Sequence, residues 1–163
     1  MGVVPVIKNE HLRTTVIKGL KRHLGIPVIK ANQNTEPPEY PYLTYNITTL
    51  ESANAGTWGE YSDGIDRIPV TQTWSISLLS DKELESVELA IKARDFLQHS
   101  GTSYLNDNDV IVEGATSITS RDSFISIEYE YKNGFDVTFW MLAEETNPIE
   151  DIGTIVKVRL KEV

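Results

Sequence analysis

The sequence predicts an α+β fold, with two amphipathic helices packed on a mostly antiparallel β-sheet and a long loop or extended hairpin between the second and third strands. Two segments, 9–25 and 80–100, place apolar residues three or four positions apart, as an amphipathic helix does. Several other segments alternate apolar and polar residues, which is typical of strands with one buried face. The chain has 163 residues, 40% of them hydrophobic, so we expect a single domain over residues 1–163.

The first helix is expected over residues 9–25. Asn9 is a suitable N-cap, and Gly25 stands where a left-handed C-terminal cap would follow the last turn. One face is apolar, and its residues recur every four positions: Leu12, Val16, Leu20 and Leu24. A short strand should follow at 26–31, where Pro27 lacks the N–H that a central strand needs and therefore belongs at the start of the strand or on an edge.

A long arm, residues 51–69, separates two predicted antiparallel strands at 43–50 and 70–78. It is rich in Gly, Ser, Asn and Asp, yet it carries large apolar side chains. Loops longer than about 12 to 15 residues are uncommon in compact domains and are usually functional or disordered. Two interpretations stay open: an arm that orders against a neighbouring subunit, and an extended hairpin folded on its own domain. The candidate interface residues of the arm are Trp58, Tyr61, Ile65 and Arg67.

The second helix, residues 80–100, has the strongest local signals. Ser80 followed by Glu83 predicts a capping box, and Gly101 predicts the end of the helix. A wide apolar stripe is expected to pack on the sheet through Leu84, Val87, Ala90, Ile91, Phe96 and Leu97.

The C-terminal part is predicted to be mostly strand. A turn region is expected at 106–109, and Asn133-Gly134 predicts a tight hairpin turn at 132–134, since two-residue hairpin turns prefer this pair. The remaining strands are expected at 110–119, 123–131, 135–142 and, within a C-terminal extension over 143–163, at 154–160.

The residues that usually signal catalysis or metal binding do not occur in a telling pattern. There are no cysteines, which excludes thiolate nucleophiles and cysteine-ligated metals. The three histidines, His11, His23 and His99, lack the spacing of a zinc motif, and Asp107-Asn108-Asp109 lacks the glycine and glutamate of a calcium loop. No glycine pattern fits a phosphate-binding loop. We therefore expect no catalytic residues, no cofactor and no metal.

The charge and hydropathy of the chain argue against nucleic acids and membranes as binding partners. The formal net charge is −9, whereas a protein that grips nucleic acid needs a clustered basic surface. The one basic cluster, at Lys18, Lys21, Arg22 and His23, lies at a predicted helix end, where the helix dipole favours cations. No segment approaches the length of a membrane span, and no leader is evident, so we expect a protein made in the cytoplasm that does not contact a membrane.

Three motifs resemble the phage tail-terminator, or neck-terminator, family of long-tailed phages and phage-tail-like bacteriocins. They are Pro41-Tyr42-Leu43-Thr44-Tyr45, Gln72-Thr73-Trp74-Ser75-Ile76-Ser77 running into the helix at 84–97, and Tyr131-Lys132-Asn133-Gly134-Phe135-Asp136-Val137. The resemblance covers residues 9–142. The long arm and the C-terminal extension exceed what a minimal member of this family needs.

The resemblance implies a non-enzymatic virion protein of the tail or neck that is assembled in the host bacterial cytoplasm. Such a protein forms a hexameric ring, caps the head-proximal end of the tail tube, ends tube polymerisation and docks the head connector. The implied partners are further copies of the chain, the tail tube protein and the head–tail connector or stopper, with DNA passing through unbound. Alternatives are another neck or tail component, such as a head–tail stopper or tail-tube subunit, and a small ligand-binding domain or enzyme.

Overall fold

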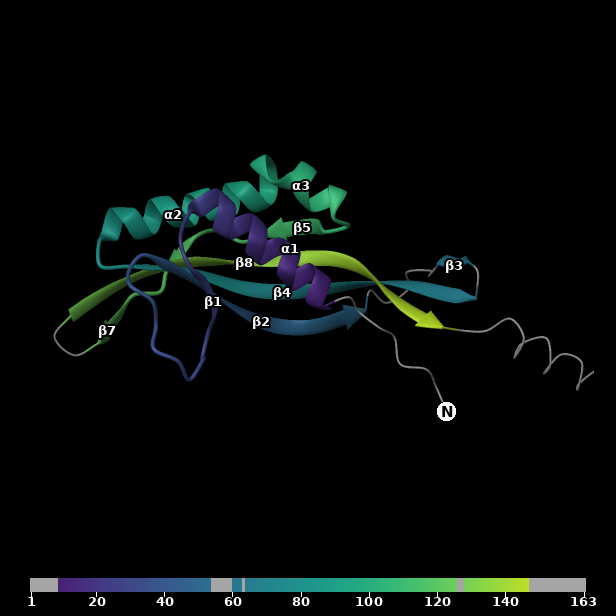
Figure 1. Cartoon of the computed structure of the whole chain (residues 1–163), viewed down its shortest axis with the longest axis horizontal. Coiled ribbons are helices and arrows are strands. Elements are labelled where there is room, and N and C mark those ends of the chain that lie inside the picture. The colour runs from purple at the N-terminus through teal and green to yellow at the C-terminus, as the bar shows by residue number, and fades with distance from the viewer. Residues whose placement is uncertain (1–8, 54–59, 63, 126–127, 147–163) are drawn as a thin grey trace, which may run out of the picture.

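The computed structural model describes residues 9–53, 60–62, 64–125 and 128–146. It confirms the predicted α+β class (Figure 1). The helices are α1 (Asn9–Leu24), α2 (Glu83–Asp95), the π-helical turn η1 (Phe96–Ser100) and α3 (Thr102–Asp107). The strands are β1 (Val28–Lys30), β2 (Tyr42–Ala53), β3 (Glu60–Ser62), β4 (Ile65–Ser80), β5 (Ile111–Ala115), β6 (Thr119–Ser120), β7 (Ser123–Ile125) and β8 (Glu128–Thr146).

The main path of the sheet runs β1-β2-β4-β8-β5, so the two longest strands, β4 and β8, lie at its centre. The short strands β3, β6 and β7 add to the ends of β4 and β8. Strand β1 pairs in parallel with β2, placing Val28 beside Leu43, and the other described pairs are antiparallel. Strand β1 is therefore an edge strand, as Pro27 just before it predicts.

One face of the sheet carries the core, because alternate residues of three neighbouring strands bring apolar side chains side by side. Ile76 of β4 lies opposite Tyr45 of β2 and Phe135 of β8, and all three are buried. Apolar residues of the helices belong to the same cluster: Leu12, Val16, Leu20 and Leu24 from α1, and Ala90 and Ala93 from α2. The helices therefore form one layer over this face.

Helix α1 confirms the first predicted element. It ends before Gly25, which has φ +68° and donates its N–H to the Lys21 carbonyl at 2.8 Å, as a left-handed cap does. At the other end, Asn9 Oδ1 accepts a hydrogen bond from Gln72 Nε2 at 2.8 Å, which ties the helix start to the centre of the sheet.

The predicted capping box at Ser80 is wrong. Ser80 is the last residue of β4 and is fully buried, so α2 begins three residues later, at Glu83. The Ser80 hydroxyl accepts the Lys82 N–H at 3.0 Å and donates to Glu85 at 2.7 Å, instead of capping the amide of Glu83. The serine thus closes the turn between strand and helix.

The predicted apolar stripe of this helix is also partly wrong. Small residues, Ser86, Ala90 and Ala93, form its buried face, which brings the helix axis close to the sheet. Leu84 and Ile91 point the other way and are 75% and 55% exposed. Phe96 and Leu97 are buried as predicted, and they lie in the π-helical turn that continues α2.

A third helix, α3, precedes the turn region predicted at 106–109 and takes up its first two residues, while the turn itself lies at 108–109, where Asp109 has φ +60°. Gly101 separates α3 from η1, as predicted, but the reason is steric: a Cβ at this position would overlap the ring of Phe96. Tyr104 of α3 donates its hydroxyl to the Thr15 carbonyl at 2.9 Å, which holds α3 against α1.

The hairpin turn predicted at 132–134 does not exist. Strand β8 runs without interruption over 19 residues, and Asn133 and Gly134 lie inside it opposite Leu78 and Ser77. The chain reverses earlier, since Ile125 of β7 pairs with Glu128. The strands predicted separately at 123–131 and 135–142 are therefore a short strand and one long strand.

The strand predicted at 110–119 is shorter than expected and broken, with a register shift in β5 between Val112 and Gly114 before β6 begins at Thr119. The strand predicted at 154–160 lies outside the described residues. Within the described ranges, no helix combines the length and the apolar character needed to cross a membrane.

Candidate assembly surfaces

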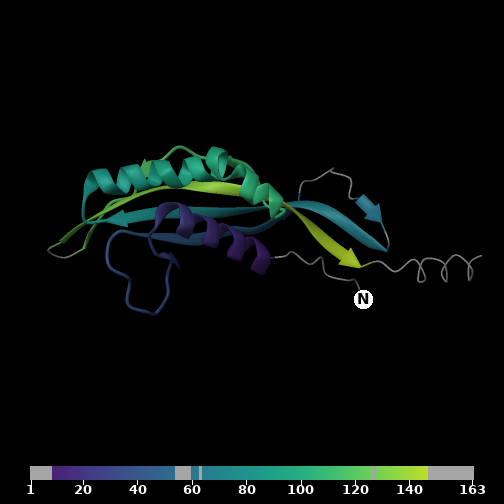
Figure 2. The ribbon, with the colours of Figure 1, turned by 45° about the horizontal axis from the view of Figure 1, so that its top comes forward.

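The described part of the arm, β3 and the first part of β4, projects from the domain beside the last part of β8, with which β4 pairs. These strands run past the ends of the helices (Figure 2). The pairing is continuous, with Ile65 opposite Thr146 on one side and Ser62 on the other. In chain order, Val70 is the first β4 residue that pairs with β2, and Pro69 precedes it. The N–H that proline lacks therefore falls where β4 has no pairing with β2. Of the arm predicted at 51–69, residues 51–53 lie in β2, 60–62 in β3 and 65–69 in β4, whereas 54–59 and 63 lie outside the described residues.

A cross-strand ion pair marks this arm. Arg67 of β4 and Glu144 of β8 occupy opposite positions in the register, and Arg67 Nε lies 3.7 Å from Glu144 Oε1. Both side chains are about one-third exposed, at 29% and 33%. An ion pair this exposed contributes little to stability, typically below about 1 kcal/mol. Its charges remain accessible to a partner.

The structure brings three of the four candidate interface residues onto neighbouring strands. Ile65 and Arg67 belong to β4, and Tyr61 of β3 is paired with Asp66 between them. Ile65 is partly buried, the side chain of Tyr61 lies outside the described residues, and Trp58 lies entirely outside them. Glu144 carries no signal in the sequence, because its place beside Arg67 depends on the β4–β8 register.

The basic cluster of α1 is divided between two environments. The guanidinium of Arg22 lies over the ring of Tyr104, 5.0 Å from its centroid, and the His23 ring stacks on Phe96 at 5.0 Å. Lys18 and Lys21 are exposed. The ion pairs among the described residues use none of the four side chains.

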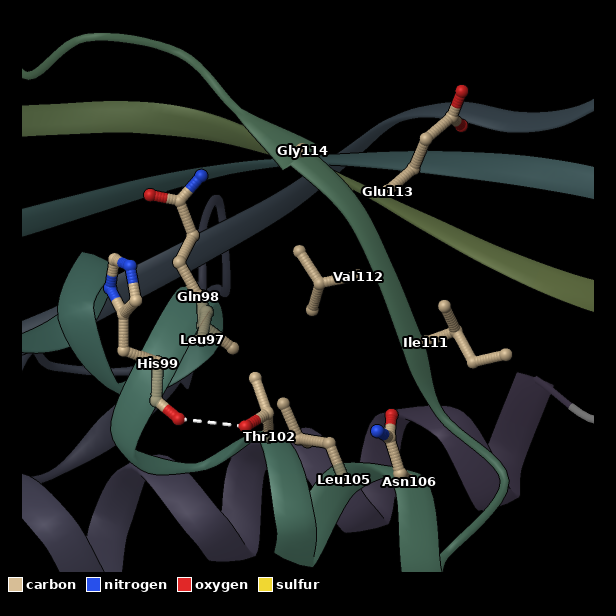
Figure 3. A pocket seen from close by; sticks show the side chains of 10 residues that line it. All are labelled: Leu97, Gln98, His99, Thr102, Leu105, Asn106, Ile111, Val112, Glu113 and Gly114. Carbon is tan, nitrogen blue, oxygen red and sulfur yellow. Dashed lines mark hydrogen bonds between the residues drawn. The ribbon is translucent and has the colours of Figure 1, made fainter.

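A shallow pocket of about 360 Å³ lies between β5, η1 and α3. Figure 3 shows His99 and Thr102 on the helical side and Glu113 on β5, with the Glu113 carboxylate pointing away from both. The Thr102 hydroxyl donates to the His99 carbonyl at 2.8 Å. The His99 ring pairs instead with Asp95, which does not line the pocket, and Nδ1 lies 3.3 Å from Asp95 Oδ1. These polar groups do not converge on one point, so they do not form an acid–base or nucleophile arrangement.

Metal ligands do not gather in the described part of the chain either, where no three His, Asp or Glu side chains are placed to hold one ion. A charged cluster does occur on the open face of the sheet, where Arg121 lies 3.1 Å from Asp136 and donates to Ser75 at 2.7 Å. These contacts satisfy the guanidinium within the molecule, so the cluster is structural.

The sequence profile of a family described as phage neck terminator protein matches residues 14–162. No curated protein matches the sequence significantly. A solved chain titled as the virion of a native gene transfer agent particle is 13% identical, with a TM-score of 0.38, and the match covers 82% of this chain and 94% of that one. Another solved chain, whose title states no function, is 11% identical with the same TM-score of 0.38, covering 87% and 99%.

Proposed function

The chain belongs to the phage neck terminator family, a family of structural phage neck proteins, and from this we propose that it is the ring subunit that closes the tail tube. In this proposal several copies, six by the resemblance, form a ring on the head-proximal end of the tube. The ring ends tube polymerisation and offers its other side to the head connector. The observation that carries the proposal is the family match over residues 14–162, which spans nearly the whole chain.

The projecting arm supports a role in assembly. A hairpin that extends beyond its own helical layer has few contacts within its own molecule, and it can reach a neighbouring subunit or the tube. Ile65 and Arg67 are available there, with Glu144 beside Arg67. We propose that this arm, including Trp58 and Tyr61, contacts the tube protein or the next subunit.

The edge strands offer a second means of association. Strand β1 is one end of the main sheet path and β5 is the other. Edge strands present backbone N–H and C=O groups that pair with another chain. We propose that β1, or residues 154–160, completes such pairing between subunits of the ring.

The charge balance suits a protein through which DNA passes. With a formal net charge of −9, the chain repels phosphates in general, so a ring of these subunits would let DNA slide instead of holding it. We further propose that residues 1–163 act as one non-enzymatic domain, assembled in the host bacterial cytoplasm.

The test is electron microscopy of tail tubes that were assembled without this protein and then mixed with it. Density at the head-proximal end of each tube, together with an end to further tube growth, supports the proposal. Incorporation along the tube would instead identify a tube subunit. Binding only to the isolated connector would identify a stopper-type neck component.

A further inference from the structure

The outward side of α2 is an apolar surface that the described part of the chain leaves exposed. Leu84 and Ile91 are seven residues apart, so they lie on one side of the helix, about 10 Å from each other along its axis. They are 75% and 55% exposed, whereas the other long helix of the layer, α1, buries its leucines. We define the outer face of α2 as Leu84, Val87, Glu88, Ile91 and Asp95.

Acidic charge accompanies this apolar surface. Glu88 lies between Leu84 and Ile91 on the same side of the helix, and Asp95 follows four residues after Ile91. Asp95 has one neighbour of opposite sign, His99 at 3.3 Å, which is charged only when protonated. No ion pair among the described residues involves Glu88. The outer face of α2 therefore combines exposed aliphatic side chains with two carboxylates, Glu88 and Asp95.

Helix α1 carries a surface of complementary chemistry. A shallow hollow of about 660 Å³ is lined by Arg13, Thr14, Ile17, Lys18, Lys21 and Arg22. Ile17 is partly buried, whereas Lys18 and Lys21 are exposed and carry long aliphatic stems. Thr14 and Lys21 are seven residues apart, so the hollow has about the same 10 Å length as the apolar ridge of α2. We call this set the basic face of α1.

We propose that the outer face of α2 in one subunit docks into the basic face of α1 in the next copy of this chain. Leu84 and Ile91 would cover Ile17 and the lysine stems, while Lys18 and Lys21 would meet Glu88 and Asp95. Among the described residues, no ion pair joins the two faces within one molecule.

The proposed contact is head to tail, because the two faces differ. Such an interface generates a ring when the rotation between subunits closes, and a filament when it does not. The inference thus rests on the proposed ring and names the surfaces that would hold neighbouring subunits together.

Charge reversal tests the pairing directly. The first variant is Lys18→Glu with Lys21→Glu, and the second is Glu88→Lys with Asp95→Lys. Each places like charges across the interface, and we expect each alone to weaken self-association by on the order of 100-fold. Mixed in equal amounts, the two variants should again form rings, with the subunits alternating. A chain that carries all four substitutions should also assemble alone.

The measurements are the mass in solution by sedimentation and, for samples that remain monomeric, capping of tail tubes by electron microscopy. Circular dichroism confirms that each variant is folded. The matched control is Glu36→Lys with Glu39→Lys, two exposed reversals in the segment between β1 and β2 and outside both faces, which should assemble as the original protein does.

Each outcome decides a specific point. If either single-face variant assembles normally, or if neither the mixture nor the four-substitution chain regains assembly, the docking of α2 on α1 is wrong while the ring proposal stands. If Leu84→Ser with Ile91→Ser leaves rings intact but abolishes tube capping, the outer face of α2 binds the tube protein instead. If the original protein forms no ring in solution or on tubes, the proposed function itself fails.

Discussion

Gly134 in β8 lies directly against the backbone of Ile76 in the neighbouring strand, so that a Cβ on residue 134 would overlap the Ile76 carbonyl oxygen. The Arg121 guanidinium and the Ser77 hydroxyl crowd the same space, each 3.0 Å from the position of that Cβ. The glycine therefore serves close strand packing and the placement of Arg121.

Replacing Gly134 by alanine should lower the free energy of unfolding by about 1–3 kcal/mol, since an added methyl group in a filled space forces its neighbours to shift. Urea denaturation followed by tryptophan fluorescence measures this. The control is Gly114→Ala, where the added Cβ would meet nothing within 4 Å. Equal stability of the two variants would contradict the close approach to Ile76.

The buried side chain of Gln72 links the sheet to α1. It is 1% exposed, accepts the Trp74 indole N–H at 2.7 Å and donates to Asn9 Oδ1 at 2.8 Å. Gln72→Met keeps the size but leaves the indole N–H without this acceptor, so we expect a loss of about 1–3 kcal/mol by thermal and urea unfolding. Gln98→Met, at the rim of the pocket beside β5, should change stability by less than about 0.5 kcal/mol.

Tyr42 should make the fold sensitive to alkaline pH. Burial, reinforced by the nearby Glu130 carboxylate, raises the pKa of the Tyr42 phenol above its ordinary value of 10.0. The folded state thus holds the proton more tightly than the unfolded state does. The resulting stabilisation is full below pH 10 and is lost as pH rises through the raised pKa. In Tyr42→Phe the free energy of unfolding, measured by urea denaturation, should fall less steeply above pH 10. The same dependence on pH in both proteins would contradict the raised pKa of Tyr42.

Side chains of the arm should matter for assembly more than for folding. Ile65→Ser with Arg67→Ser removes a partly buried aliphatic group and an exposed ion pair, so we expect stability to fall by no more than about 2 kcal/mol. Capping of tail tubes should be lost. Thr48→Ser with Thr49→Ser, on β2 where both side chains are exposed, serves as control. Unfolding of the arm variant would mean that these residues stabilise the domain itself.

Local signals in the sequence predicted the elements that depend on local chemistry. The spacing from Leu12 to Leu24 with Gly25 predicted α1, and the alternation in 70–78 predicted the centre of β4. The turn predicted at Asn133-Gly134 was wrong because the local preference of this pair for tight turns is outweighed by continuous pairing between β8 and β4. Asn133 lies opposite Leu78 and Gly134 opposite Ser77.

The surfaces were harder to predict because they depend on tertiary packing. Leu84 and Ile91 appear in the sequence as part of a buried stripe, but Ala90, Ala93 and Ser86 form the face that meets the sheet. The pairing of Arg67 with Glu144 depends on the register between distant strands. The candidate residues of the arm were identified by composition alone, and their role in binding stays a prediction.

A ring that ends the tail tube can be seen by electron microscopy of tubes that were assembled without this chain and then incubated with the purified protein. We expect annular density on the head-proximal end of each tube and no further elongation when tube protein is added. Tubes that stay bare and continue to grow, with the protein folded and monomeric in the same sample, would contradict it.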